Sequence, residues 1–354
     1  MNIRSLFLLI VPAALMGCSK NSHKPSSGHD SSGVNQTNIY FSGTYTDDSI
    51  LQRACYWKND SLTILYGGSV SEGNAIALSG TDLYVAGQVD AQPAYWKDGN
   101  MVSIAHGFTT ASASGICVSG SNVYVTGEGD DSTGNPVAWY WVNGQFTFLS
   151  VDTTWTFTNG IAVSGSDVYV VGFSFTPGKT NAVAKCWVNG VATNLTDGTR
   201  NANANSIFIA GTDVYIAGTE TDATNTHRIA KFWKNGTPII LSDSSGADAA
   251  LSILVSGSDV YVTGEMQPGT VSNPTGTVIG GYWKNGTFVQ LSNGTINCYV
   301  GNLALSGQDV YVSYYSYSNH GFPVPTYFKD GLSVQLYEDP TADAMASAVL
   351  VAPQ

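Results

Sequence analysis

One short segment, an apolar run followed by a tight turn and a second apolar run, recurs along almost the whole chain. It reads ILVSGSDVYVTG at Ile253–Gly264, and the tyrosine of its second run recurs every 40 to 50 residues, as Tyr40, Tyr84, Tyr124, Tyr169, Tyr215, Tyr261 and Tyr311. A second aromatic marker keeps in step with the first, as Trp57, Trp96, Trp141, Trp187, Trp233, Trp283 and Phe328. A period of this length is typical of propeller blades, in which each repeat buries its faces only against its neighbours.

Each period contains four short strand candidates bounded by turn residues. In the sixth period they are Ser252–Ser256, Val260–Gly264, Ile279–Lys284 and Phe288–Ser292. The Asn-Gly pair that joins the last two favours a type I′ hairpin turn, and it recurs in three other periods. Because the Val-Tyr-Val runs are continuously apolar, we expect their strands to be covered on both faces.

An aspartate follows the Ser-Gly turn in five periods, as Asp82, Asp167, Asp213, Asp259 and Asp309. A ring of carboxylates is one interpretation of this repetition. Aspartate commonly hydrogen-bonds its own turn backbone, and a repeated turn needs the same residue each time. We therefore predict that these aspartates are structural.

The two ends of the chain predict how the ring closes. The first period begins at Ile39 with its second strand, and the chain ends with the missing strand type at Ser347–Ala352. Pairing these ends would leave no open sheet edge. The prediction is an all-β domain over residues 39–354: a seven-bladed β-propeller of four-stranded antiparallel blades, closed by the C-terminal strand joining the first blade.

Residues 1–17 have the features of a signal peptide. Arg4 precedes the apolar run Leu6–Met16, which is too short to span a bilayer. The sequence Leu15-Met16-Gly17-Cys18 resembles the lipobox of bacterial lipoproteins. The resemblance implies that Cys18 is the lipid attachment site and that acyl chains hold the protein on a membrane. An ordinary secretory signal with an incidental cysteine is the alternative.

The segment that follows, residues 18–38, is rich in serine, glycine and asparagine and is expected to be a flexible tether. By analogy with other lipoproteins, Ser19 directly after Cys18 indicates the outer membrane as the location. Whether the domain faces the periplasm or the outside stays open.

Charge and cysteine usage narrow the functional classes. The chain has a formal net charge of −12, and its 14 lysines and arginines are scattered, which argues against nucleic acid as a partner. Cys55, Cys117, Cys186 and Cys298 lie in different periods and do not resemble a disulfide framework. We expect them to be small buried side chains.

The strand order places the tight turns on one face of the ring and the longer, unequal loops on the other. Loops on a rigid scaffold commonly carry function. Aromatic rings in such loops stack on sugars or anchor protein partners. Burial against their own blade is the alternative for these rings. The candidate ligand-binding residues on this long-loop face are Trp155, Phe173, Phe175, Arg228, Tyr315 and His320.

We identify no catalytic residues, no metal site and no cofactor requirement. The histidines within the repeats lack partners at metal-ligand spacing, and motifs for nucleophilic catalysis or phosphate binding are missing. Glu128, Glu220 and Glu265 follow the Val-Tyr-Val strand in three periods, where paired acids are able to cleave glycosidic bonds. The arginines of the repeats, Arg53, Arg200 and Arg228, also lie towards the long-loop face.

The alternation of Ala-x-x-Trp-x-Asn-Gly-x-x-x-x-Leu with Ala-x-x-Ile-x-x-x-Gly-x-x-Tyr-Val-x-Gly resembles the HAF-type extracellular repeats of bacterial envelope lipoproteins, over residues 39–352. The sequence departs from that family in its Tyr-Trp and Ser-Gly-Ser-Asp segments. The resemblance implies a propeller and export, and it carries no assigned reaction.

The function expected from the sequence is therefore a membrane-tethered, non-catalytic propeller that binds an envelope or extracellular glycan or protein. A polysaccharide-processing hydrolase or lyase and a structural envelope protein are the alternatives.

Overall fold

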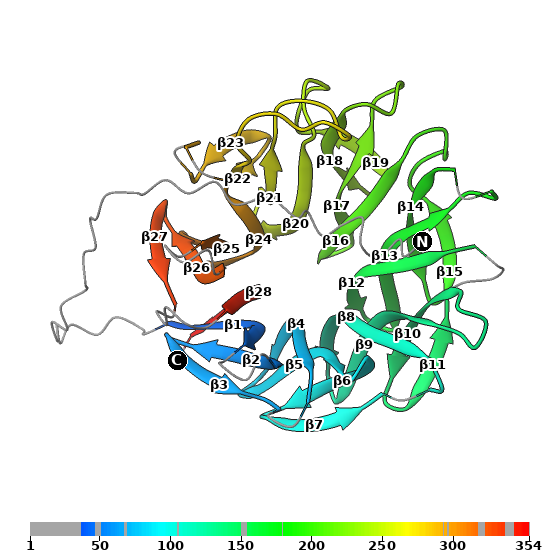
Figure 1. The fold of residues 1–354 in the computed structure, drawn as a ribbon, viewed down its shortest axis with the longest axis vertical. Helices are drawn as coiled ribbons and strands as arrows, with labels where there is room; N and C mark the ends of the chain where they lie inside the picture. The colour runs from blue at the N-terminus through cyan, green and yellow to red at the C-terminus, as the bar shows by residue number, and fades with distance from the viewer. Residues whose placement is uncertain are drawn as a thin grey trace, which may run out of the picture.

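The computed structural model describes residues 37–46, 51–66, 69–104, 106–149, 154–178, 180–292, 294–295, 297–317, 323–336 and 343–353. These residues form seven four-stranded antiparallel sheets around a central axis, as Figure 1 shows. The predicted seven-bladed propeller is confirmed. Within the described residues, no helix has the length and apolarity needed to cross a bilayer.

Blades two to seven each consist of four consecutive strands, with the innermost strand first in sequence. Blades two, three and four contain β4 (Ser71–Ser79), β5 (Asp82–Val89), β6 (Gln92–Lys97), β7 (Asn100–Ser103); β8 (Thr110–Ser119), β9 (Asn122–Asp130), β10 (Pro136–Val142), β11 (Gln145–Phe148); and β12 (Thr156–Ser164), β13 (Asp167–Phe175), β14 (Ala182–Val188), β15 (Val191–Asn194). Blades five, six and seven contain β16 (Ala202–Ala210), β17 (Asp213–Thr221), β18 (Arg228–Lys234), β19 (Thr237–Ile240); β20 (Ala249–Ser256), β21 (Asp259–Met266), β22 (Ile279–Lys284), β23 (Thr287–Gln290); and β24 (Tyr299–Ser306), β25 (Asp309–Tyr317), β26 (Pro323–Lys329), β27 (Leu332–Gln335).

Blade one joins the two ends of the chain. Its sheet has the order β28-β1-β2-β3, from β28 (Asp343–Pro353), β1 (Thr37–Thr46), β2 (Gln52–Lys58) and β3 (Ser61–Ile64). The C-terminal strand pairs antiparallel with β1 along its length, with Phe41 opposite Val349. The predicted closure is confirmed, and β28 begins four residues earlier than the sequence pattern indicated because the pairing continues through a bulge opposite Ser42 and Gly43.

Tryptophans fill the spaces between blades. Trp96, Trp187, Trp233 and Trp283 of the third strands are almost completely buried. The glycine of the Tyr-Val-x-Gly motif leaves room for them: a Cβ on Gly264 would lie 2.5 Å from the Trp283 ring and 2.0 Å from the Ala249 carbonyl oxygen. The tryptophan and the glycine recur together in the sequence because the strands that carry them approach closely.

Asparagine amides link successive inner strands. Each inner strand contains a bulge, and in three blades the residue omitted from the register is an asparagine. The Nδ2 atoms of Asn74, Asn159 and Asn205 donate to carbonyl oxygens in the next blade, at 3.0, 2.8 and 2.7 Å. These bonds satisfy polar backbone groups at the ring's centre and link blade two to three, four to five, and five to six.

The repeated aspartates and Asn-Gly pairs join two hairpin turns on one face. In blade five, Asn235 has a φ of 50°, and its Oδ1 accepts from the Val214 amide at 2.8 Å. Its Nδ2 donates to Asp213 Oδ1 at 2.8 Å, and Lys234 Nζ lies 2.8 Å from Asp213 Oδ2. The aspartates are structural, as expected, but their partners belong to the neighbouring turn rather than their own.

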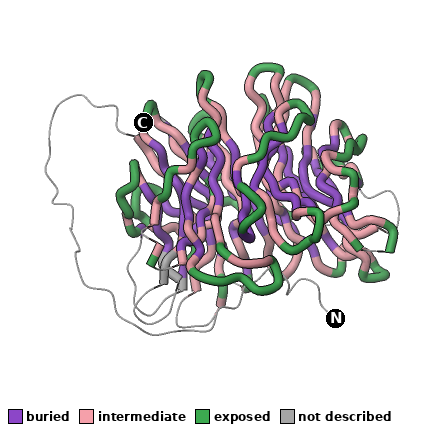
Figure 2. The backbone as a smooth tube through the Cα atoms, turned by 90° about the horizontal axis from the view of Figure 1, so that it is seen from above, coloured by how far each residue is buried: buried purple, intermediate pink, exposed green. Residues whose placement is uncertain are grey.

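Buried residues form a layer between two loop-bearing faces, as Figure 2 shows. In blades two to seven the strand register places the two tight hairpin turns at one end of the strands, and the other connections at the opposite, long-loop end. Blade two differs from expectation, because its β5–β6 connection is only the tight turn Asp90-Ala91, with both residues at positive φ.

Candidate functional site

Four aromatic side chains gather at the long-loop end of blade four. Side chains alternate along β13, so that Val171, Phe173 and Phe175 share one face. Val171 packs in a cluster with Ile207 and Trp233 of blade five. The face that carries Phe173 and Phe175 is therefore turned towards blade five.

These rings, with Trp155 and Phe157, form a contiguous group that we call the aromatic wall. Phe157 stacks on Phe173 with centroids 5.0 Å apart, and Phe175 meets the rings of Phe173 and Trp155 edge-on at 5.8 and 6.3 Å. The backbone amide of Phe175 donates to the Trp155 carbonyl at 2.9 Å. Phe173 is buried, whereas Trp155, Phe157 and Phe175 are partly exposed. The wall is thus anchored at its base and accessible along its edge.

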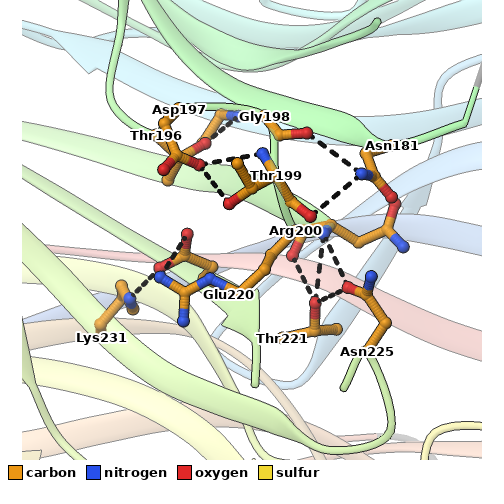
Figure 3. Close-up of polar contacts among 12 residues, drawn as sticks. Asn181, Thr196, Asp197, Gly198, Thr199, Arg200, Glu220, Thr221, Asn225 and Lys231 are labelled. Carbon is orange, nitrogen blue, oxygen red and sulfur yellow. Dashed lines mark hydrogen bonds and ion pairs between the residues drawn. The ribbon is translucent and has the colours of Figure 1, made fainter. Parts of the chain in front are cut away.

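A charged trio lies at the same interface, formed by Glu220 and Lys231 of blade five and Arg200 of the loop between β15 and β16. Glu220 shares its strand face with Ile216, which packs against blade four. Lys231 Nζ lies 2.5 Å from Glu220 Oε2, and Arg200 Nη2 lies 3.2 Å from Glu220 Oε1. Figure 3 shows the Lys231 and Arg200 side chains directed at this carboxyl group. The side chains of Glu220 and Lys231 are each 7% exposed, and that of Arg200 is 34% exposed.

The loop that carries Arg200 is fastened to both blades. Asn181, in the β13–β14 loop that follows Phe175, donates from Nδ2 to the carbonyl oxygens of Gly198 and Thr199. Asn201 Oδ1 accepts from the Ala182 amide at 3.0 Å, and the Asn201 amide donates to Thr221 Oγ1 at 3.1 Å. These bonds set the position of Arg200 at the interface between blades four and five, which we call the blade four–five seam.

The structure brings three of the six sequence candidates together and separates the others. Trp155, Phe173 and Phe175 belong to the aromatic wall. Arg228 begins β18 on the opposite face of blade five, where Nη2 donates to the Ala247 carbonyl at 3.1 Å and desolvation lowers the guanidinium pKa. Tyr315 lies in blade seven and stacks on Tyr299 at 5.2 Å. His320 and the lipid attachment candidate Cys18 lie outside the described residues.

The three glutamates face different blade interfaces. Glu220 is turned towards blade four, whereas Glu265 shares a strand face with Tyr261, which packs against blade seven. Glu265 accepts a hydrogen bond from the Val300 amide, yet desolvation raises its pKa to about 7. Glu128 lies in blade three. The three carboxyl groups therefore do not converge on one site.

The four cysteines of the repeats are unpaired, and the acidic side chains of the described residues do not gather into a metal-binding group. Cys55, Cys117, Cys186 and Cys298 are free thiols, as expected, and burial raises the pKa of each one. In the described part of the chain, no group of three or more His, Cys, Asp or Glu side chains is arranged to hold a metal ion.

Sequence reasoning missed Phe157 and Lys231 as members of the seam. At the Phe157 position of the inner strand, blades two, three and five have Glu72, Ser112 and Asn203 instead. Blades six and seven have Ala249 and Tyr299 there, so the position varies between repeats and an aromatic residue at Phe157 was only a weak signal. Lys231 lies opposite Gly218, and the equivalent position of blade four is also a lysine, Lys185, so the repeat pattern did not single out Lys231.

No protein-family model matches the sequence, and no curated protein matches it. Solved structures with a similar fold include the acylaminoacyl peptidase of Pyrococcus horikoshii, with a TM-score of 0.55, 12% identity and coverage of 85% of this chain and 50% of that chain. A puromycin-hydrolyzing peptidase of Mycobacterium tuberculosis has a TM-score of 0.54 at 10% identity, covering 84% of this chain and 51% of that chain. The chain therefore spans about half the length of these two peptidases.

The β-propeller domain of the Trilobed protease from Pyrococcus furiosus is similar over 85% of this chain and 96% of that domain, with a TM-score of 0.52 and 10% identity. That domain is described as having an open velcro topology, whereas here β1 and β28 pair within one sheet. At these identities the likeness establishes the propeller fold alone.

Proposed function

We propose that this protein is a membrane-tethered, non-catalytic binding propeller whose blade four–five seam binds a glycan at the long-loop face. The observation that supports this proposal best is the aromatic wall, whose partly exposed rings share the blade four–five seam with the charged trio. An aromatic face beside planar polar side chains suits a sugar, because its apolar ring face stacks while its hydroxyl groups are hydrogen-bonded.

The arrangement of acids favours binding over glycoside cleavage. A glycosidase places two carboxyl groups about 5 to 9.5 Å apart on either side of the bond that it cleaves. Glu220 is held by two cations, and Glu265 lies in another blade interface. A binding role needs only that the seam be rigid and accessible, and the cross-blade bonds of Asn181 and Asn201 supply that rigidity.

The membrane tether belongs to the same proposal. The signal-like residues 1–17, the lipobox-like segment ending at Cys18 and the tether-like residues 18–38 suit an exported protein that displays its domain at a distance from a lipid surface. An outer-membrane location follows from the same segment.

Alanine variants of the accessible rings test the proposed site. The full chain, solubilised in detergent, is applied to a glycan array, and the strongest glycan is titrated by calorimetry. We expect Trp155→Ala and Phe175→Ala each to weaken binding about tenfold, which corresponds to losing about 1.4 kcal/mol of ring contact.

Leu332→Ala is the matched control, because Leu332 is 73% exposed beside a tight turn of the opposite face. It should bind as the parent does. The glycan proposal fails when the parent retains no glycan, or when the two aromatic variants bind like the control. Capture of an envelope protein that depends on Trp155 would replace the glycan with a protein partner.

A further inference from the structure

We propose that the ligand of the blade four–five seam is an acidic glycan, and that Arg200 binds the carboxylate of a uronic-acid-type sugar. This inference rests on the proposed glycan-binding function and names its substrate class. The observation behind it is a partly exposed guanidinium, in the same seam as the aromatic wall, that lies against a glutamate whose charge is already balanced.

The charges of the trio do not cancel. Glu220 carries one negative charge. Lys231 is buried to the same degree, and its Nζ atom lies 2.5 Å from Glu220 Oε2. Arg200 contacts only the other oxygen of that group, at 3.2 Å, and is the exposed member of the trio. Because a buried cation needs a close partner more than an exposed one does, Lys231 neutralises Glu220 and leaves the positive charge of Arg200 for a ligand.

Asp197 is the other acid that interacts with Arg200, and it is bound within its own loop. Its Oδ1 accepts from the Thr199 amide at 2.9 Å and from Thr199 Oγ1 at 2.7 Å, and these bonds are the main reason that its pKa is lowered. Asp197 is exposed, so water screens its attraction for Arg200. The guanidinium can therefore exchange this weak interaction for a direct contact with a ligand.

The two sides of the seam suit the two parts of a uronic acid. A guanidinium forms paired, charge-assisted hydrogen bonds with a carboxylate in one plane. The aromatic wall presents ring surfaces to the apolar face of the same sugar or of the next residue in the glycan. The net charge of −12 is spread over the whole chain, and salt screens charges that lie more than about 8 Å apart under physiological conditions. Local contacts at Arg200 therefore dominate recognition.

A matched pair of polymers tests the carboxylate directly. Polygalacturonate and its methyl ester share one sugar backbone, and esterification removes the negative charge. Alginate and hyaluronan extend the acidic set, and xylan and dextran form the neutral set. Binding to the full chain in detergent is measured by affinity electrophoresis and calorimetry. We expect at least one acidic polymer to bind, a tenfold or greater loss on esterification of polygalacturonate where that polymer binds, and a similar loss for Arg200→Ala.

Stability measurements and two further variants separate the loss of the Arg200 charge from a loss of folding. Arg200→Ala leaves the buried Glu220–Lys231 pair in place, and its circular dichroism and melting curve should match those of the parent. Arg200→Lys should bind between the parent and the alanine variant, because it keeps the charge and loses the paired donors. Lys97→Ala removes an exposed cation from the opposite face and should leave binding unchanged.

These outcomes distinguish the inference of an acidic glycan from the broader proposal that the seam binds a glycan. Binding to neutral polymers that depends on Trp155 and is unaffected by Arg200→Ala overturns the acidic class and leaves the glycan-binding function standing. Absence of binding to every polymer in both sets overturns both.

Discussion

Two glutamates in the second strands of neighbouring blades experience opposite surroundings. Glu220 sits between two cations, whereas Glu265 has one backbone amide as its hydrogen-bond donor and a pKa raised to about 7 by desolvation. Glu220 and Glu265 are offset by one position relative to the repeat. Because adjacent residues point to opposite faces of a sheet, the two side chains face different blades. Glu220 meets the cations of its own seam, and Glu265 meets the packed surface of blade seven.

The raised pKa of Glu265 predicts a pH dependence of stability. Its ordinary pKa is 4.5 and its folded pKa is about 7, so between these values the folded state binds more protons than the unfolded state. The free energy of unfolding should therefore fall as pH rises from about 4.5 to 7 and be constant above that range, with a loss of ~3 kcal/mol from this group.

Glu265→Gln removes the ionisation and keeps the shape of the side chain. We expect the variant to be more stable than the parent at pH 8 and to lose the slope between pH 5 and 7, as measured by urea denaturation. Identical slopes in the two proteins would show that Glu265 does not control the pH dependence.

At the level of the elements, the paired hairpin turns hold each blade together on the face opposite the seam. One asparagine adopts the left-handed turn conformation, accepts from a strand amide and contacts the repeated aspartate. The same position is an aspartate in blades two and seven, where Asp98 and Asp330 accept from the corresponding strand amides at 2.9 Å. The oxygen acceptor is thus the shared requirement of the turn.

Asn235→Ala should destabilise the protein by about 1 to 3 kcal/mol, because it removes that acceptor and places a Cβ-bearing residue without local hydrogen bonds at positive φ. Asn235→Asp retains the acceptor and should cost less. Chemical denaturation of both variants measures the difference, and equal losses would contradict the assigned role of the oxygen.

At the level of the whole molecule, the C-terminal strand determines whether the ring closes. β28 covers β1 and contributes Ala344, Ala346 and Val349 to a core cluster with Phe41 and Trp57. Without it, blade one loses its innermost strand and β1 becomes an exposed edge.

Deletion of Ser347–Gln354 should therefore prevent stable folding. We expect the truncated chain to lack a cooperative melting transition and to be degraded rapidly by protease, and replacement of Val351 by alanine in the full chain provides a milder control. A truncated protein that melts as the parent does would contradict this role for β28.

The sequence by itself determined the repeat, and with it the fold. Seven periods of turn residues and aromatic markers indicated seven blades, and the unequal ends of the first and last periods indicated the closure, because these features depend on local turn chemistry and on pairing between consecutive strands. The same local rules located Trp155, Phe173 and Phe175 within one repeat on the long-loop face. They do not say which side chains of different repeats share a seam.

That assignment was decided by the tertiary structure. Glu220 and Glu265 follow equivalent strands and were grouped together by sequence, yet a shift of one residue relative to the repeat turns them towards different blades. Arg228 and Glu220 lie on paired strands, but on opposite faces of blade five. Lys231 meets Glu220 because β17 and β18 pair within blade five. Arg200 meets it because the loop between blades four and five is bonded to both of these blades. Which charges face the aromatic wall therefore depends on how the blades pack around the ring, and no single repeat contains that information.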